Sequence, residues 1–241
     1  MNLNKQLGQN YLISKKIVTK IIENSEIRPD ETVCEMGSGK GAMTFDLCKK
    51  AKSVISFEID KKLYEQLFMK SIKYKNLQLI NKDILKYEKP LAFDVFVSNI
   101  PYSRSRDTIS WLATKKFNRA LIMVQKEFAD KLRASKTETN YKAISAISQY
   151  CFDIHTLFDV GKDAFFPRPK VESEAIKLTP KNLLVTMNLI SIIHYIFSFK
   201  NKKVAKISKK NLIDLEMKNT RIRELNPVEI FELAKKLLTF K

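Results

Sequence analysis

Short apolar runs alternate with amphipathic segments from Ile13 to Leu178 of this chain. Between the runs, apolar residues recur at helical spacing, as Ile17, Ile21 and Ile22 do after Ser14. Strands that alternate with helices predict βαβ units and a mainly parallel sheet. Such sheets bind ligands beyond the carboxyl ends of their strands. The predicted strands are Thr32–Met36, Val54–Glu58, Leu77–Ile80, Asp94–Ser98 and Ala120–Val124.

The pattern changes after Pro180. The remaining residues contain no strand-like run, and helical patterns cover Leu184–Phe199 and Pro227–Leu238, where Asn226 can cap the second helix. We therefore predict an α/β domain at residues 1–180 that carries the active site. A small, basic, helical C-terminal domain is predicted at residues 181–241.

The composition indicates a folded protein with a polyanionic partner. The 241 residues are 44% hydrophobic, which excludes intrinsic disorder. Lys and Arg number 44 against 26 Asp and Glu, so the formal net charge is +18. The cations gather in the first twenty residues, in residues 104–119 and in residues 200–223. Clustered positive charge attracts polyanions and favours a nucleic-acid partner.

Other classes of site are not indicated. Cys34, Cys48 and Cys151 are widely spaced and form no pair typical of a disulfide framework or a zinc site. His155 and His194 lack acidic or cysteine companions at ligand spacing, so no metal is expected. The first residues contain no apolar run typical of a signal peptide, and the later apolar stretches fall short of the ~20 residues of a membrane span. A cytoplasmic protein without a membrane partner is expected.

A glycine-rich loop follows the first predicted strand. Gly37, Gly39 and Gly41 stand between that strand and a helix, at a spacing that matches neither the P-loop nor the dinucleotide fingerprint. Such a loop lets a nucleotide-like ligand approach the main chain, so Gly37 and Gly39 are predicted to bind a cofactor.

Acidic residues end the neighbouring strands. Glu35 ends the first and is expected to face the pocket; Glu58 suits ribose hydroxyls, and Asp83 suits an adenine amino group. These carboxylates would repel a diphosphate. They fit an adenosyl cofactor with a positive charge and no phosphate, which is S-adenosyl-L-methionine. The alternative is that Glu58 and Asp83 only cap the helices that follow them.

The tetrapeptide Asn99-Ile100-Pro101-Tyr102 follows the fourth predicted strand. It resembles the Asn/Asp-x-Pro-aromatic active-site motif of methyltransferases that act on exocyclic amino groups of bases, which implies a base such as adenine as the acceptor. The exocyclic nitrogen of adenine is a poor nucleophile because its lone pair is delocalised into the ring. The Asn99 side-chain oxygen and the Ile100 carbonyl can accept its two N–H groups, while Pro101 fixes the turn without a competing N–H. Tyr102 offers a stacking ring to a flipped base, and Phe165 or Phe166 can cover the other face.

Five ordered blocks resemble a known family over about residues 5–180. Together they are similar to the ribosomal RNA adenine N6-dimethyltransferases of the KsgA type. The blocks are Leu7–Leu12, Glu35–Gly39, Asn99–Tyr102, Met123–Glu127 and Phe165–Val171.

The resemblance implies a Rossmann-like class I S-adenosylmethionine-dependent methyltransferase sheet with a small helical C-terminal domain. It implies dimethylation of N6 on two adjacent adenosines near the 3′ end of small-subunit rRNA, within the small ribosomal subunit or its precursor. A monomer is expected. The cofactor contacts carried over from the family fall on Asn10, Leu12, Gly37, Glu58, Asp83 and Asn99.

Several basic residues are predicted to hold RNA phosphates. Arg168 and Lys170 lie beside the aromatic pair. Arg104 and Arg106 depart from the family, which has an apolar residue and then Ser-Ser or Ser-Thr after the tetrapeptide, so they would add two cations at the pocket mouth. Lys200, Lys202 and Lys203 stand where the family has an Arg-rich helix. Lysine neutralises phosphate without forming bidentate forks, so that contact should be general.

Three alternatives stay open. The first is the Erm branch, which modifies a large-subunit rRNA adenosine and confers macrolide resistance, although Gln125–Glu127 and Phe166–Lys170 favour the small-subunit branch. The second is a non-catalytic RNA- or DNA-binding factor on the same scaffold, against which the intact cofactor residues argue. The third is a dehydrogenase, which would give Asn99–Tyr102 no role.

Overall fold

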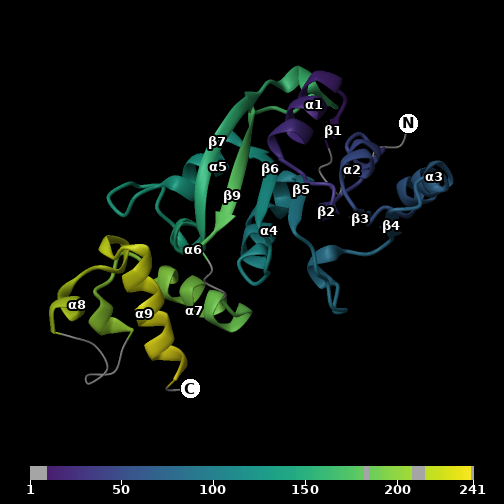
Figure 1. The fold of residues 1–241 in the computed structure, drawn as a ribbon. Helices are drawn as coiled ribbons and strands as arrows, with labels where there is room; N and C mark the ends of the chain where they lie inside the picture. Colours follow the sequence, from purple (N-terminus) through teal and green to yellow (C-terminus); the bar gives the residue numbers. More distant parts are fainter. Residues whose placement is uncertain (1–9, 182–184, 208–214, 240–241) are drawn as a thin grey trace. The chain divides into compact units, whose positions relative to one another are not determined.

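The computed structural model describes residues 10–181, 185–207 and 215–239, so Leu7–Gln9 of the first block lie outside the described residues. Within the described ranges, seven strands form one sheet in the order β4-β3-β2-β5-β6-β9-β7 (Figure 1). The pairs among β2, β3, β4, β5 and β6 are parallel, and β9 runs antiparallel to β6. The strands are β2 (Thr32–Met36), β3 (Ser53–Phe57), β4 (Leu77–Ile80), β5 (Val95–Asn99), β6 (Arg119–Gln125), β7 (Phe152–Val160) and β9 (Ser173–Pro180). The predicted mainly parallel α/β sheet is confirmed.

Two helices of the sheet unit, α1 and α3, begin at capping residues that the sequence indicates. The Ser14 hydroxyl accepts from the Ile17 N–H at the start of α1 (Lys15–Asn24), and the Asp60 carboxylate caps α3 (Lys61–Ser71) in the same way. α2 (Thr44–Lys50) packs beside β3, and α3 packs beside β4. These connections fix the direction of each parallel strand, so the carboxyl ends of the strands share one edge of the sheet.

The two outer strands β7 and β9 were not predicted. β7 carries a histidine and two aspartates, and most of its residues are exposed or half-buried, so it lacks the apolar run of a buried strand. The short strands β1 (Tyr11–Leu12) and β8 (Phe165–Phe166) also escaped prediction; they pair antiparallel, with Tyr11 opposite Phe166. This pairing brings the N-terminal segment to the aromatic pair.

The chain divides into two compact units. The first holds the sheet and comprises Met1–Thr108, Lys116–Lys126 and His155–Pro180. The second comprises Ile109–Lys115, Glu127–Ile154 and Lys181–Lys241. One boundary of the second unit therefore lies at residue 180, where the sequence predicts a domain boundary, but this unit also includes two earlier segments.

The second unit is helical. In it α6 (Ala143–Cys151), α7 (Met187–Ser198) and α9 (Pro227–Leu238) pack on one another, with the Tyr150 ring stacked on Phe231 at a centroid distance of 3.6 Å. Asn226 and Glu229 form a capping box at the start of α9, as the sequence predicts for Asn226. The other α-helices among the described residues are α4 (Ser105–Leu112), α5 (Lys126–Arg133) and α8 (Leu215–Asn219). Within the described ranges, no helix has both the length and the apolar character required to cross a membrane.

A buried ion pair fastens β6 to the turn that precedes β2. The Arg119 guanidinium donates to Glu31 Oε1 at 2.9 Å and to Oε2 at 2.7 Å, and its Nε donates to the Ser25 carbonyl at 2.7 Å. The two side chains are only 11% and 2% exposed. The guanidinium hydrogen bonds hold the pKa of Glu31 at about 2, well below its usual value.

We expect Glu31→Gln to lower the free energy of unfolding by about 3 kcal/mol at neutral pH, because it leaves the Arg119 charge buried without its partner. The low folded pKa means that the ion pair stabilises fully above the ordinary carboxylate pKa of about 4.5 and progressively less as the pH falls toward 2. Urea denaturation of both proteins between pH 7 and pH 2.5 measures the difference. A difference that stays constant over this range would contradict the assigned ion pair.

Candidate active site

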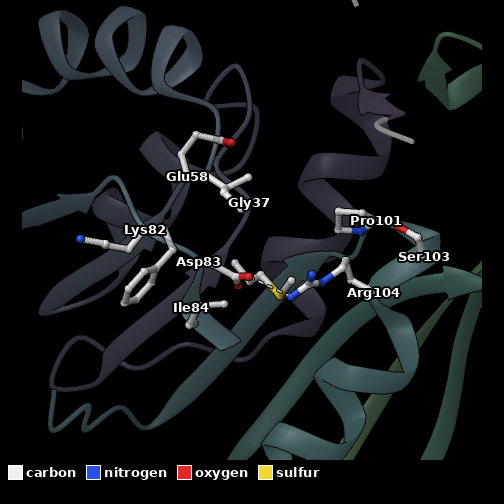
Figure 2. A pocket seen from close by; sticks show the side chains of 11 residues that line it. Gly37, Glu58, Lys82, Asp83, Ile84, Pro101, Ser103 and Arg104 are labelled. Atoms are coloured by element: carbon white, nitrogen blue, oxygen red, sulfur yellow. Dashed lines mark hydrogen bonds and ion pairs between the residues drawn. The ribbon is translucent and has the colours of Figure 1, made fainter. Parts of the chain in front are cut away.

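The strand order changes direction between β2 and β5, and the main pocket lies beyond the carboxyl ends of these strands. β3 and β4 follow β2 on one side, while β5 and β6 continue on the other. Ligands of open α/β sheets bind at such a point. The pocket has a volume of about 340 Å³ (Figure 2). It is lined by Met36, Gly37, Phe57, Glu58, Ile59, Lys82, Asp83, Ile84, Pro101, Ser103 and Arg104.

The glycine loop forms one wall of this pocket. Gly37 has a φ of +78°, and a Cβ built there would meet no described atom within 4 Å. Its side-chain position therefore leaves open space for a ligand, and its backbone favours glycine. The Gly37 N–H donates to the Phe57 carbonyl at 2.8 Å, which ties the loop to the end of β3.

Glu58 lies directly after β3 and is held by the main chain. Its Oε2 accepts from the Gly39 N–H at 2.7 Å, and its Oε1 accepts from the Asp60 N–H at 2.9 Å. The residue is nearly buried, and this burial raises the pKa of Glu58 above its usual value. Glu58 therefore hydrogen-bonds to the glycine loop and lines the pocket. The alternative that it only caps the helix that follows does not account for these contacts.

Asp83 lies three residues beyond β4 and lines the main pocket together with Glu58. Its Oδ1 accepts from the Leu85 N–H at 3.0 Å, which caps the short 3₁₀ turn Ile84–Lys86. Its Oδ2 accepts from Arg104 Nη2, also at 3.0 Å. Figure 2 shows these two side chains reaching toward each other across the pocket.

Glu35 does not face the pocket, contrary to the prediction from its position. It is fully buried, and its Oε2 accepts from the Thr44 hydroxyl at 2.7 Å and from the Ser56 hydroxyl at 2.6 Å. Its Oε1 has no hydrogen-bond partner among the described residues. Burial raises the pKa of Glu35 to about 7, because desolvation outweighs the two hydroxyl bonds. The period-2 alternation of β2 turns this side chain away from the ligand side.

A smaller pocket of about 50 Å³ contains the tetrapeptide. It shares Gly37, Glu58 and Pro101 with the main pocket, so the two adjoin. The predicted cofactor residues Asn10 and Gly39 line this smaller pocket, whereas the Leu12 side chain is buried in the core. The full lining is Asn10, Tyr11, Gly37, Gly39, Glu58, Asn99, Ile100, Pro101 and Tyr102.

Asn99 ends β5 and is oriented by the N-terminal segment. Its Nδ2 donates to the Asn10 carbonyl at 3.0 Å, which leaves Oδ1 as an acceptor in the pocket. The Ile100 N–H donates to the Met123 carbonyl on β6 at 3.2 Å, and the Ile100 side chain is buried. The main chain of the tetrapeptide is therefore fixed by the sheet on one side, while its acceptors face the pocket.

The aromatic residues divide between core and surface. Tyr102 is half-buried, and its hydroxyl is 2.7 Å from the Ser173 hydroxyl at the start of β9. Phe165 is buried in the core, whereas Phe166 is 48% exposed. Of the two phenylalanines proposed to cover a base, the structure therefore leaves only Phe166 with an accessible ring.

The predicted RNA-binding cations fall into different surroundings. Arg104 was expected at the pocket mouth, but its guanidinium pairs with Asp83 inside the main pocket. Arg106 on α4 and Lys170 are exposed, and Arg168 forms a surface pair with Asp163 at 3.1 Å. In the second unit Lys200 is half-buried, while Lys202 and Lys203 are exposed.

Sequence reasoning missed several residues of the site. The apolar lining residues Met36, Phe57 and Ile84 follow from their strand-end positions, which a full mapping of the ligand edge would have found. Ser173 had no such signal, because it lies 71 residues from Tyr102 and reaches it through an unpredicted strand. Among the described residues, no group of three or more His, Cys, Asp and Glu side chains could hold a metal ion.

Comparison with known proteins identifies the family. The model of the ribosomal RNA adenine dimethylase family matches residues 1–240. The chain belongs to this family. A curated relative, the ribosomal RNA small subunit methyltransferase A of Mycoplasma mobile, is 37% identical over 93% of this chain and 90% of its own.

Solved structures agree with this placement of the chain among the dimethylases. A dimethyladenosine transferase from Plasmodium falciparum superposes with a TM-score of 0.79 at 28% identity, over 95% of this chain and 96% of the other. The 23S rRNA methyltransferase ErmE superposes with a TM-score of 0.67 at 24% identity, over 95% and 99% of the chains. At that identity ErmE shows a shared fold. The predicted class I methyltransferase fold is confirmed.

The residues of the main pocket fit the methyl donor of the dimethylase family, S-adenosylmethionine. The acidic side chains of Glu58 and Asp83 line it together with apolar Met36, Phe57 and Ile84. Hydroxyl and amino groups of an adenosine can donate to carboxylates, whereas a diphosphate would be repelled. The open space at Gly37 lets a ligand pass along the loop toward the tetrapeptide.

We expect Tyr102→Ala to lower kcat by roughly 10- to 100-fold, because it removes the ring on which a base can stack. Tyr102→Phe keeps the ring and loses only the bond to Ser173, so its kcat should fall about fivefold or less. Methyl transfer to an rRNA substrate under saturating conditions measures both.

Ser173→Ala is the matched control for the hydroxyl. It should reproduce the small effect of Tyr102→Phe, and the two changes together should cost no more than either one. A loss in Tyr102→Phe as large as in Tyr102→Ala would mean that the hydroxyl, and not the ring, is needed.

Proposed function

We propose that this protein is a cytoplasmic rRNA adenine-N6 dimethyltransferase that acts on the small ribosomal subunit or its precursor. Its target would be two adjacent adenosines near the 3′ end of the small-subunit rRNA, and it would act as a monomer. Family membership and the curated relatives named as small-subunit methyltransferases support this proposal. The observation that carries it is the position of the tetrapeptide pocket directly against the main pocket, with Gly37, Glu58 and Pro101 common to both.

The main pocket and the loop would hold the donor. Asp83 would accept from the adenine amino group and Glu58 from the ribose hydroxyls. Gly37, Gly39 and Asn10 would line the path of the amino-acid part toward the tetrapeptide. S-adenosylmethionine, when bound, supplies an electrophilic methyl group on a positively charged sulfur.

The tetrapeptide would present the nitrogen of the target base. Asn99 Oδ1, whose partner amide nitrogen is already bonded to Asn10, accepts one N–H of the exocyclic amine. The Ile100 carbonyl accepts the other, and Pro101 adds no competing donor. With both N–H groups held, the lone pair can leave the plane of the ring and point toward the donor side of the pocket. Positioning of this kind can supply most of the rate acceleration.

Assays on separate subunits test the substrate. Isolated small and large ribosomal subunits from cells that lack the modification would be incubated with the protein and radiolabelled S-adenosylmethionine. Label confined to the small subunit, at N6 of two adjacent adenosines, is expected. Label on the large subunit would favour the Erm-type alternative, and no label together with no donor binding would favour a non-catalytic factor.

We expect Asn99→Ala to lower kcat by roughly 100- to 1,000-fold, because it removes a preorganised acceptor that acts on the reacting nitrogen. Asn99→Asp keeps an oxygen at the acceptor position and loses the donor to Asn10, so it should retain more activity than the alanine variant. Single-turnover methylation with bound RNA separates this chemical step from binding.

Asn76→Ala is the matched control for loss of a half-buried amide. The Asn76 side chain donates to the Cys48 and Ala51 carbonyls and lines neither pocket. This variant should keep the kcat of the wild type. Turnover of Asn99→Ala at the wild-type rate would remove the proposed acceptor.

We further propose that residues 181–241 form a basic RNA-binding domain. Lys200, Lys202 and Lys203 surround the end of α7 and would contact phosphates without reading sequence. Replacing all three by alanine should weaken binding to all RNAs alike and flatten the salt dependence by about one unit for each lost contact. Affinity measured across a salt series on cognate and unrelated RNAs checks this. A loss confined to the cognate RNA would indicate base readout instead.

A further inference from the structure

Arg104 is one of the two cations that depart from the family's pattern after the tetrapeptide, and it lines the main pocket. It belongs to the short 3₁₀ turn Tyr102–Arg104, which begins at the last residue of the tetrapeptide. The ion pair that it forms with Asp83 joins this turn to the residues after β4.

The Asp83 carboxylate is bound on both oxygens. Oδ1 accepts from the Leu85 N–H, and Oδ2 accepts from Arg104 Nη2, each at 3.0 Å. A carboxylate oxygen has two lone-pair directions, so Oδ2 retains one. The two bonds fix the plane of the carboxylate. The remaining lone pair of Oδ2 can then accept from a donor group of a ligand.

The Arg104 side of this pair is anchored as well. The Arg104 N–H donates to the Pro101 carbonyl at 2.8 Å, and the Arg104 carbonyl accepts from the Thr108 hydroxyl at 2.9 Å. The side chains of Arg104 and Asp83 are 34% and 15% exposed. This pair is therefore less open to solvent than a fully exposed ion pair, so solvent and salt screen it less.

We propose that Arg104 is a positioning residue for the methyl donor. It holds Asp83 in the orientation that receives the adenine amino group, and it connects the adenine end of the pocket to the turn that carries Tyr102. The inference rests on the proposed function, because it assigns the main pocket to S-adenosylmethionine. It gives Arg104 a role in donor binding in place of the RNA contact expected from its sequence position.

Lys86 provides a matched control. It ends the 3₁₀ turn Ile84–Lys86 that Asp83 caps, but it is exposed, lines neither pocket and forms no ion pair among the described residues. Lys86→Ala therefore removes one positive charge close to Asp83 in the sequence and leaves the contact between Asp83 and Arg104 intact.

The experiment measures the dissociation constant of S-adenosylhomocysteine by calorimetry on the full-length protein without RNA. Arg104→Ala should weaken binding about 10-fold, as expected for the loss of a charge-assisted contact that orients a ligand group. Arg104→Lys should recover part of this loss, because lysine keeps the charge without the planar fork. Lys86→Ala should stay within about twofold of the wild type.

A double-mutant cycle with Asp83 tests the mechanism. Asp83→Ala alone should weaken binding, and Arg104→Ala should add less than about twofold in that background, because its effect passes through Asp83. In methylation assays, Arg104→Ala should raise KM for the donor by about the factor seen in binding, with kcat within about threefold of the wild type. Arg104→Met, which keeps the length of the side chain, gives the same test if the alanine variant does not fold.

Several results would overturn the inference. They are an unchanged dissociation constant in Arg104→Ala and Arg104→Met, an equal loss with and without Asp83, and an equal loss in Lys86→Ala. Failure of the proposed function looks different, because the wild-type protein would then neither bind S-adenosylhomocysteine nor methylate RNA. Wild-type binding and methylation together with an unaffected Arg104 variant would refute only the role of Arg104.

Discussion

The parallel pairing of β2 with β5 is the constraint on which the site depends. Glu35 lies opposite Val97 in this pair, so the glycine loop after β2 and the tetrapeptide after β5 leave the sheet side by side. The sheet continues from β2 to β3 on one side and from β5 to β6 on the other, so the connections after the two strands run in opposite directions. This leaves space between the two loops. A donor and a base can therefore meet here without any large insertion in the fold.

The parallel half of the sheet could be predicted from the sequence because each strand is a short apolar run with polar ends. Thr32–Met36 and Leu77–Ile80 match β2 and β4 in both bounds. β9 could not be predicted in this way, since it is an antiparallel strand and one of its neighbours, β6, comes from a distant part of the chain. The same reason hid Ser173, which touches Tyr102 only once β9 lies beside β6.

The site residues show a similar division. The positions of Glu58, Asp83 and Asn99 follow from the rule that strand ends carry the ligand contacts, and both pockets contain residues chosen in this way. The burial of Phe165 and the ion pair of Arg104 could not be predicted, because both depend on tertiary packing. Adjacent residues of a short strand point to opposite faces, which buries Phe165 and exposes Phe166. Arg104 met a carboxylate contributed by another strand end, which no local pattern could reveal.

The hydrogen bond from the Asn99 side chain to the Asn10 carbonyl orients Asn99 and also ties the N-terminal segment to the end of β5. Because the acceptor belongs to the main chain, the Asn10 side chain is left free for the smaller pocket that it lines. A small molecule that pushed the N-terminal segment away from β5 would break the hydrogen bond of the Asn99 side-chain amide. It would also open the wall of the smaller pocket, along which the donor path runs. Such a compound would act as an inhibitor without resembling either substrate.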